Sequence, residues 1–291
     1  NNFLDTVLNS KNYEVVGVSQ EKLEINGSET VSVEFVLKDS ITWTESGTTE
    51  PIEVSKKLTF RADSSIADVE VRAKRAGQTI ENMKLLIGMA IGDQGIQVHN
   101  YYQVEPEAVA YVANTVDRHA AYQVVPSGQT TGKIAVAGEI DWAGVGDTYF
   151  GMAAIPNQKT SGLEFHGTKI TKDVDPYFNG IFAWITRTKT SKVDLHLVTA
   201  HLPVLADGSP TKVYVGSKDY FTLKKYNDQL SNDVGRQVHL SEFINFSWYW
   251  WFRPLIQPLA IGLLYCLTFI YGLVGNYGIA IIVFTLIFYS I

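Results

Sequence analysis

Hydrophobic and polar residues alternate along much of the first 240 residues of the chain. The alternation is clearest in four segments, at residues 31–36, 57–61, 67–73 and 193–198. A period of two residues is typical of β-strands that bury one face and expose the other. Turn-forming residues separate such segments, at residues 26–27, 76–77, 93–95 and 206–210. Many strands with few helices predict a mainly β fold, a large antiparallel β-sandwich.

One helix is expected near the end of this region, where the period changes. Four residues fall at helical spacing: Tyr220, Leu223, Asn227 and Leu230. Ser217 is the predicted cap and Asp219 lies in the predicted first turn, where a negative charge is favourable. Residues 231–235 end with a glycine and are expected to terminate the helix.

The pattern changes abruptly near residue 240. In the last 51 positions the only charged residues are Glu242 and Arg253. Such a change in composition indicates a change of solvent, from water to lipid. The sequence therefore predicts three parts: a β domain at 1–240, a linker with an interfacial amphipathic helix at 241–274, and a turn with the first half of a transmembrane helix at 275–291. By length alone, the apolar part of 241–274 could equally span the bilayer.

Candidate membrane-interface residues lie at the start of the apolar region. They are Trp248, Trp250, Trp251 and Arg253. Aromatic rings favour the boundary between lipid and water, and an arginine there can reach lipid phosphates. The aromatic cluster could alternatively grip a partner, and Arg253 could form a functional pair. Further on, Gly275, Asn276 and Gly278 are typical of a turn between two helices, because glycine and asparagine tolerate positive φ.

Composition and charge narrow the possible functions. The net charge is −6 and the isoelectric point is near 5.5, which argues against a nucleic-acid-binding surface. Cys266 is the only cysteine, so no disulfide forms within the chain. The chain begins without a methionine or a signal peptide and ends inside an apolar run, so we expect it to be a piece of a longer protein.

Candidate metal or catalytic groups have simpler interpretations. The six histidines are His99, His119, His166, His196, His201 and His239. His196 and His201 are five residues apart on a predicted strand and would point to opposite faces, which suits no common zinc motif. The pairs Glu139 with Asp141 and Glu164 with His166 alternate along predicted strands, as solvated side chains do. We therefore expect no metal site, no cofactor and no enzymatic activity.

Several segments together resemble the YidC family of bacterial membrane insertases, part of the wider YidC/Oxa/Alb group. The strongest matches are Phe-Arg-Pro-Leu at 252–255, Val-Gly-Asn-Tyr-Gly at 274–278, and the β-branched apolar run that follows, with Thr285 inside it. Residues 56–60, 149–156 and 213–216 resemble further family segments. The resemblance covers roughly residues 30–291. It implies a periplasmic β-supersandwich, related in fold to sugar-mutarotase domains, that precedes the helical membrane segments.

One position departs from the family pattern. Eleven residues after the last glycine of the turn, many family members carry an arginine that gives a water-filled groove its positive charge. This chain has Tyr289 at that position. Thr285 and Tyr289, four residues apart, remain candidate groove residues. The resemblance therefore does not extend to the arginine that charges the groove in the family.

The resemblance implies a membrane protein insertase and chaperone, acting alone or with the Sec translocon. Its expected partners are nascent inner-membrane proteins, Sec translocon components and the lipid bilayer. Its expected location is the bacterial inner membrane, crossed several times, with residues 1–240 in the periplasm. The alternative is a membrane-tethered periplasmic module that binds a sugar, a peptide or an assembly partner. The length and span count of the complete gene product would separate the two.

Overall fold

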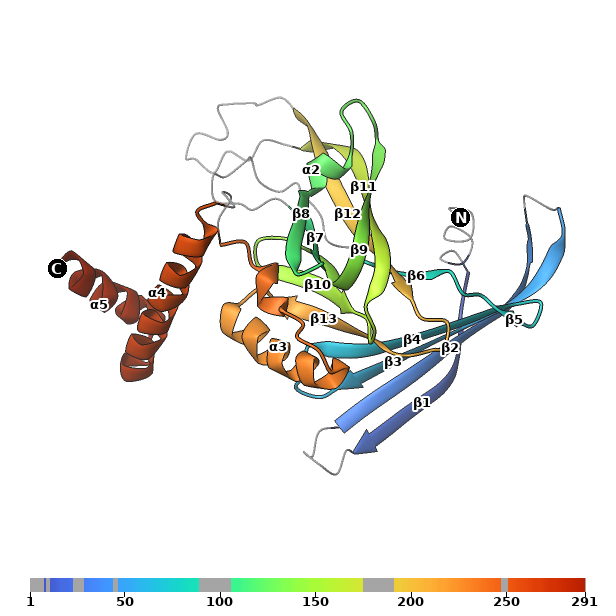
Figure 1. Cartoon of the computed structure of the whole chain (residues 1–291), viewed down its shortest axis with the longest axis horizontal. Coiled ribbons are helices and arrows are strands. Elements are labelled where there is room, and N and C mark those ends of the chain that lie inside the picture. The colour runs from blue at the N-terminus through green and yellow to red at the C-terminus, as the bar shows by residue number, and fades with distance from the viewer. Residues whose placement is uncertain are drawn as a thin grey trace, which may run out of the picture. The chain divides into compact units, whose positions relative to one another are not determined.

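The computed structural model describes residues 8, 11–22, 29–43, 47–88, 106–174, 191–246 and 251–290. It divides into two compact units, Asn1–Phe243 and Ile244–Ile291 (Figure 1). The first unit is mainly β and the second is helical. Each unit is described by itself.

Antiparallel strands make up the first unit. Among the described residues they are β1 Glu14–Lys22, β2 Glu29–Thr42, β3 Thr49–Arg61, β4 Ile66–Arg75, β5 Gln78–Thr79, β6 Met83–Ile87, β7 Glu107–Val112, β8 Thr115–Ala120, β9 Thr131–Gly146, β10 Phe150–Ile155, β11 Thr160–Val174, β12 Ser191–Val204 and β13 Thr211–Ser217. Their main order is β1-β2-β3-β4-β13-β10-β9-β11-β12-β6. The four alternating segments lie within β2, β3, β4 and β12, so the prediction of an antiparallel β domain is confirmed.

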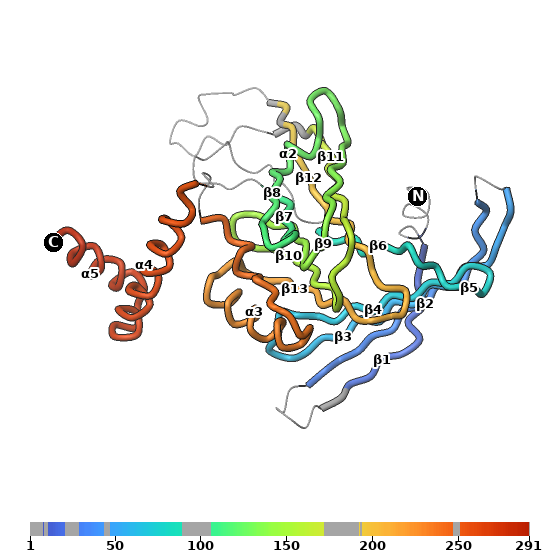
Figure 2. The backbone as a smooth tube through the Cα atoms, in the orientation of Figure 1, coloured from blue at the N-terminus to red at the C-terminus, as the bar shows by residue number. Residues whose placement is uncertain are grey.

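The sheet changes direction along its length. Figures 1 and 2 show β9, β11 and β12 running upright, whereas β2, β3, β4 and β13 run across the view. The main core joins both parts, because Ala154 of β10 and Val213 of β13 belong to the same buried cluster as Phe165 of β11 and Val198 of β12. Residues 140–146 of β9 and 211–214 of β13 are buried without alternation, so both faces of these stretches are covered.

The β1–β4 part of the sheet has two unlike faces. One face carries a second apolar cluster of Leu37, Ile41, Ile52, Val54 and Ala73. The opposite face carries charged and polar side chains. The turn predicted at residues 76–77 is present between strands β4 and β5. Ala76 and Gly77 both have positive φ there, 48° and 83°. The predicted turns at 26–27 and 93–95 lie outside the described residues.

The described residues of this unit also include the helix α2 Ala121–Val124, the longer helix α3 Tyr220–Val234 and the 3-10 helix η1 Leu240–Phe243. In α3 the predicted spacing is right, since Leu223 and Leu230 are fully buried. The predicted cap is wrong. The side chain of Asp219 accepts a hydrogen bond from the Thr222 amide at 2.8 Å, whereas Ser217 is the last residue of β13.

The predicted end of α3 is also too early. The helix continues through residue 234 and stops at Gly235, whose φ is +68°. Glycine adopts this left-handed conformation without steric cost, so it ends the helix where the preceding polar residues did not. Polar residues in 231–234 are therefore a weaker stop signal than the glycine itself.

The second unit contains α4 Arg253–Val274 and α5 Tyr277–Tyr289. α4 has 22 residues, and an 18-residue stretch of it has a mean hydropathy of 1.7, so it is long and apolar enough to cross a membrane. α5 is apolar but shorter. Within the described part of this unit, Ala280 is the one buried hydrophobic residue. Its apolar side chains therefore do not form a water-excluding core of their own.

Candidate functional site

The helical hairpin of α4, the intervening turn and α5 contains most of the site residues expected from the sequence. Pro254 stands in the first turn of α4, where its missing N–H costs no helical hydrogen bond. Arg253 Nε lies 3.4 Å from Gln257 Oε1, one turn along the helix. The two side chains form a small polar stripe at the start of an otherwise apolar helix.

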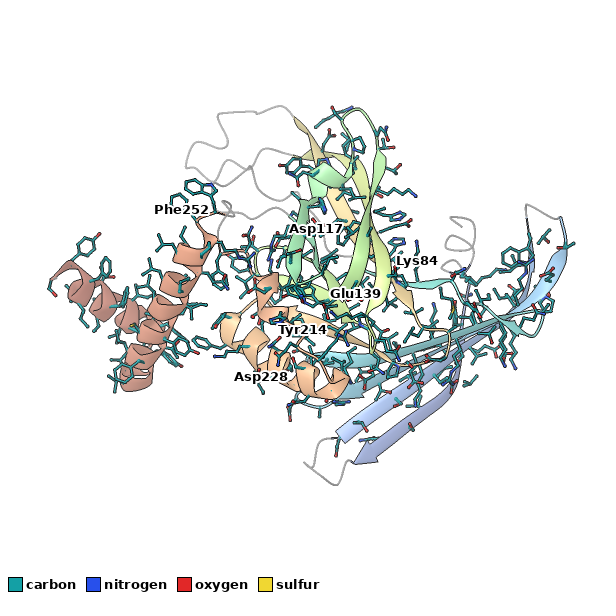
Figure 3. The ribbon with its side chains drawn as sticks, viewed as in Figure 1. Lys84, Asp117, Glu139, Tyr214, Asp228 and Phe252 are labelled. Atoms are coloured by element: carbon teal, nitrogen blue, oxygen red, sulfur yellow. The ribbon has the colours of Figure 1, made fainter. Side chains whose placement is uncertain are left out.

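Aromatic rings gather where α4 begins. Trp251 and Phe252 stack with their ring centroids 3.9 Å apart, and Trp251 is 59% exposed. Figure 3 labels Phe252 at the start of the helix. Trp248 and Trp250 lie outside the described residues. The described rings are therefore placed as an exposed aromatic pair beside Arg253.

The turn between the helices is built from two different devices. Gly275 has a φ of +67° and donates its amide to the Tyr271 carbonyl at 2.7 Å, which ends α4. Asn276 has an extended φ of −143° and does not use the positive φ that its residue type tolerates. Its side chain instead accepts hydrogen bonds from the amides of Gly278 and Ile279, at 2.8 and 3.3 Å.

This capping role of Asn276 was missed in the sequence. The signal was present, because asparagine followed by an apolar run is a common helix start. A ring stack between Tyr271 and Tyr277, with centroids 3.9 Å apart, spans the turn from α4 to α5. The cap and the stack together give the hairpin a defined bend.

The candidate groove residues both lie on the exposed surface of α5. Thr285 Oγ1 donates to the Ile281 carbonyl at 2.7 Å, and Tyr289 is 85% exposed. The threonine hydroxyl is therefore satisfied within its own helix. Its presence alone does not require a polar environment, so the groove assignment rests on position and not on an unsatisfied group.

A buried charge cluster contradicts one expectation from the sequence. Glu139 is solvated as expected, with a side chain that is 77% exposed (Figure 3). Asp141 is not, because only 3% of its side chain is exposed. Arg236 Nε and Lys159 Nζ each lie 3.1 Å from this carboxylate, on Oδ1 and Oδ2 respectively. The prediction that Asp141 is solvated was wrong because its partner Arg236 is 95 residues away in the sequence. An arginine that pairs with a strand carboxylate offsets the cost of burying it.

Arg236 also fastens the segment that follows α3. Its guanidinium donates to the carbonyls of Pro156 and Asn157, at 2.7 and 2.8 Å. Six residues after Arg236, the carbonyl of Glu242 accepts a hydrogen bond from Arg118, which also pairs with Glu107 at 2.8 Å. These contacts hold the end of the first unit against β7, β8 and β9.

The pair Glu164 and His166 belongs to a surface cluster on the sheet. Lys84 donates to Glu164 at 2.8 Å, and His166 lies 3.1 Å from the same carboxylate oxygen. Lys84, then His166, lower the pKa of Glu164 from 4.5 to about 2, against a smaller opposing effect of burial. The rings of His166 and His201 stack at 3.9 Å. A lowered carboxylate pKa makes this group a poor general acid or base near neutral pH.

No three metal-ligating side chains come close enough to hold an ion within the described part of the chain. His99 lies outside it. His196 and His201 fall on opposite faces of β12, because five residues separate them on one strand. The histidines that are brought together, His166 and His201, meet through neighbouring strands β11 and β12.

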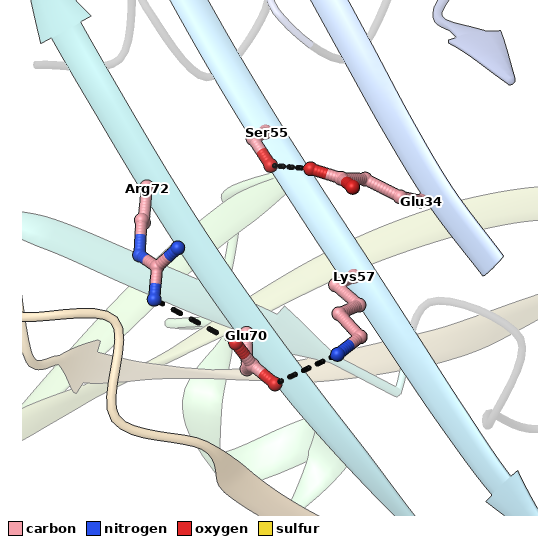
Figure 4. Close-up of a pocket in the computed structure, with 5 residues that line it drawn as sticks. All are labelled: Glu34, Ser55, Lys57, Glu70 and Arg72. Carbon is pink, nitrogen blue, oxygen red and sulfur yellow. Dashed lines mark hydrogen bonds and ion pairs between the residues drawn. The ribbon is translucent and has the colours of Figure 1, made fainter. Parts of the chain in front are cut away.

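A pocket lies on the polar face of β2, β3 and β4 (Figure 4). It has a volume of about 330 Å³ and is lined by Glu34, Ser55, Lys57, Glu70 and Arg72. Ser55 donates to Glu34 at 2.9 Å, while Lys57 and Arg72 both approach Glu70, at 3.9 and 3.8 Å. The charged side chains that line the pocket are thus engaged with one another or with Ser55.

The fold and the hairpin together define a class of protein: a large antiparallel β domain joined in one chain to apolar helices, one of which is long enough to cross a membrane. No family model matches the chain. Curated proteins do. The chain is 25% identical over 266 residues to the membrane protein insertase YidC of Chlorobaculum tepidum. The aligned region covers 89% of this chain and 38% of that protein.

Further relatives carry the same name. The YidC of Syntrophus aciditrophicus is 26% identical over 81% of this chain and 36% of its own length. That of Granulibacter bethesdensis is 29% identical over 50% of this chain and 21% of its own length. The resemblance to YidC that the sequence predicted is confirmed. The chain spans about two fifths or less of the length of these curated relatives.

Proposed function

We propose that this chain is part of a membrane protein insertase, with a large β domain ahead of the first helices of the membrane region. The similarity to proteins named YidC carries the proposal. It leaves about 11% of the chain unmatched, roughly 32 residues, which is fewer than the 48 in Ile244–Ile291. The match therefore includes most of the β domain and reaches into the helical unit.

The proposed placement follows from the two solvents that the sequence indicates. The β domain, residues 1–240, lies in the periplasm. α4 lies in the bilayer interface with Trp251 and Arg253 at headgroup depth, and α5 begins the first membrane span. A protein of this kind lowers the cost of moving a polar segment across half the bilayer, a cost of about 2.5–3.5 kcal/mol per charged residue on insertion scales.

The finer assignments are part of the same proposal. The clients are nascent inner-membrane proteins, and the protein acts as insertase and chaperone, alone or with components of the Sec translocon. Thr285 and Tyr289 face the client groove. No nucleotide or metal is needed, because the energy comes from transferring apolar client surface into lipid.

The test is insertion of a client by the complete gene product. Expressed in a bacterial strain depleted of its own insertase, the protein should restore insertion of a small two-span client, measured as protease protection. Glu53→Gln, a change on the exposed surface of β3, is the matched control and should restore insertion equally. Failure of the intact, membrane-located protein to restore insertion contradicts the proposal. That result, with few further spans encoded after residue 291, would favour a tethered binding module.

Topology and helix placement need separate measurements. With Cys266 replaced by serine, Ser127→Cys in the exposed turn before β9 should react with an impermeant maleimide in spheroplasts. Labelling only after lysis would place the β domain in the cytoplasm. The native Cys266 near the middle of α4 reports its depth. Quenching by headgroup nitroxides supports an interfacial helix, whereas quenching only by deep nitroxides means that α4 spans the bilayer.

A further inference from the structure

An exposed aromatic tip stands at one end of the β domain. Tyr149 and Phe150, at the turn from β9 to β10, are 73% and 60% exposed. Two adjacent aromatic side chains in water forgo a large part of the free energy that burial would supply. Among the exposed large hydrophobic side chains of the described part of this unit, Tyr149 has the highest exposed fraction, and Phe150 adjoins it.

The tip is held in a fixed shape. Asp147 Oδ1 accepts hydrogen bonds from the amides of both Tyr149 and Phe150, each at 2.8 Å. The Asp147 amide donates to the Phe150 carbonyl at 2.9 Å, and the Lys218 amide donates to the Tyr149 carbonyl at 2.7 Å. The backbone polar groups of the turn are thus largely satisfied internally. The exposed rings are presented on a braced turn, and their exposure does not come from an unanchored loop.

The tip lies beside the end of the β domain. Phe243, the last residue of the first unit, packs so closely on Gly151 that a Cβ there would overlap its ring. Lys218 joins the two features, because its Nζ donates to the Asp147 carbonyl at 3.0 Å and lies 5.0 Å from the centroid of the Phe243 ring. The aromatic tip and the exit of the chain therefore share one corner of the domain.

Only residues 244–252 separate this corner from the first residue of α4. Ten Cα steps span at most about 33–36 Å even when fully extended. If α4 lies in or on the bilayer, the corner at Phe243 is therefore tethered within about 36 Å of the start of α4, which leaves the tip able to reach the lipid surface. The nature of its rings matches that environment, since aromatic side chains are favoured at the interface.

We propose that Tyr149 and Phe150 form a membrane-contact tip, which enters the interfacial layer of the bilayer that holds α4. The proposal rests on the membrane placement of α4 given above. A lipid surface fits better than a protein partner, because two side chains are far fewer than the 20–30 residues per side of a stable protein interface. With the tip in lipid, the β domain has a second point of attachment besides the linker.

The experiment measures depth in phosphatidylcholine vesicles that contain the full-length protein, with a nitroxide on the lipid headgroup. An environment-sensitive dye is attached to one cysteine at a time. Phe150→Cys and Tyr149→Cys, each with Cys266→Ser, report on the tip. Ile170→Cys with Cys266→Ser is the matched control. Ile170 is 46% exposed and lies beyond the end of β9 opposite to the tip, separated from it by the length of that strand, at most about 50 Å at ~3.3 Å per residue.

At least a twofold loss of dye fluorescence at either tip position, with little loss at Ile170, supports the proposal. Equal and small losses at all three positions overturn it. A blue shift at the tip without quenching by lipid also overturns it, because the rings would then be covered by protein. The dye on native Cys266 separates the two proposals. Quenching at Cys266 without quenching at Tyr149 or Phe150 contradicts only the membrane-contact tip. No quenching at Cys266 contradicts the membrane placement of α4 itself.

Discussion

Large apolar side chains are buried in the core of the β domain but exposed in the helical hairpin. In the β domain, Trp142, Phe165 and Leu230 are fully buried. In the helical hairpin, Leu259, Leu273 and Leu286 are 62%, 72% and 66% exposed. The difference teaches that apolar composition does not by itself predict a core. Where the solvent is lipid, an apolar side chain gains nothing by turning inward.

Charges show the same contrast. The β domain buries Asp141 and compensates it with Arg236 and Lys159. In the described part of the hairpin, the one formally charged side chain is Arg253, the first residue of α4, where the membrane interface is expected. Charge is therefore tolerated inside the β domain through pairing, and in the hairpin through position.

The largest effect should come from removing the partner of the buried carboxylate. Arg236→Met should lower the free energy of unfolding by about 3–5 kcal/mol, because Asp141 would keep only Lys159 in a site that excludes water. Urea unfolding of the whole chain in detergent micelles, followed by circular dichroism, measures the loss.

The matched control removes an exposed pair. Lys38→Met breaks the ion pair between Lys38 and Glu53, whose two side chains are 73% and 48% exposed respectively. This variant should change the free energy of unfolding by less than about 1 kcal/mol. If both variants lose equally little, Lys159 alone suffices for Asp141, and pairing with Arg236 is not what stabilises the buried charge.

Next in size is a leucine pair that compares the two solvents directly. Leu230→Ala in α3 should cost about 2–5 kcal/mol, because it leaves a cavity in a closed core. Leu259→Ala, in α4, should change the unfolding transition in micelles by no more than about 0.5 kcal/mol, since the side chain is exposed. A large loss for Leu259→Ala would mean that α4 packs against protein, and the contrast between the units would fail.

A smaller effect is expected from Glu164, a charge of intermediate exposure. Lys84 and His166 hold its pKa at about 2, below its ordinary 4.5. A depressed pKa stabilises the fold above the ordinary value, and this stabilisation is lost as the pH falls from about 4.5 toward 2. In Glu164→Gln, the urea midpoint should therefore decline less steeply over that range than in the unchanged chain.

Glu139→Gln, which alters a 77% exposed carboxylate, is the control for this measurement. Its urea midpoint should decline with acid as steeply as that of the unchanged chain. Parallel decline in Glu164→Gln would show that the cluster of Lys84, Glu164 and His166 adds no stability on folding.

The sequence predicts what local periodicity and composition determine. Alternation located β2, β3, β4 and β12, and the helical spacing located α3. The change in composition near residue 240 falls close to the boundary between the two compact units, after Phe243. These features depend on residues that are neighbours in the chain, so they can be read without knowing the fold.

Long-range pairing could not be read in this way. Asp141 and Arg236 are 95 residues apart, and nothing near either residue signals that they meet. Likewise, β13 pairs with β4 and β10, which lie far apart in the sequence, and this brings Lys218 beside the turn at Tyr149. The aromatic tip therefore becomes a feature only in three dimensions. The groove residues on α5 stay a prediction, because both side chains are exposed and no described residue encloses them in a groove.

The smallest effect is expected at Tyr289, where the comparison between the units is sharpest. We predict that Tyr289→Arg accumulates in the membrane and supports growth of an insertase-depleted strain. Tyr289 lies one turn after Thr285 on α5 and is 85% exposed, so a cation there would reach the proposed groove. If it faced lipid instead, the charge would cost about 2.5–3.5 kcal/mol at mid-membrane, and the protein would be degraded. Ile287→Arg is the matched control, because residue 287 is at similar depth but about 200° around the helix from 289. Ile287→Arg should be lost while Tyr289→Arg persists. Loss of both would place Tyr289 against lipid, and persistence of both would show that this end of α5 is hydrated on every side.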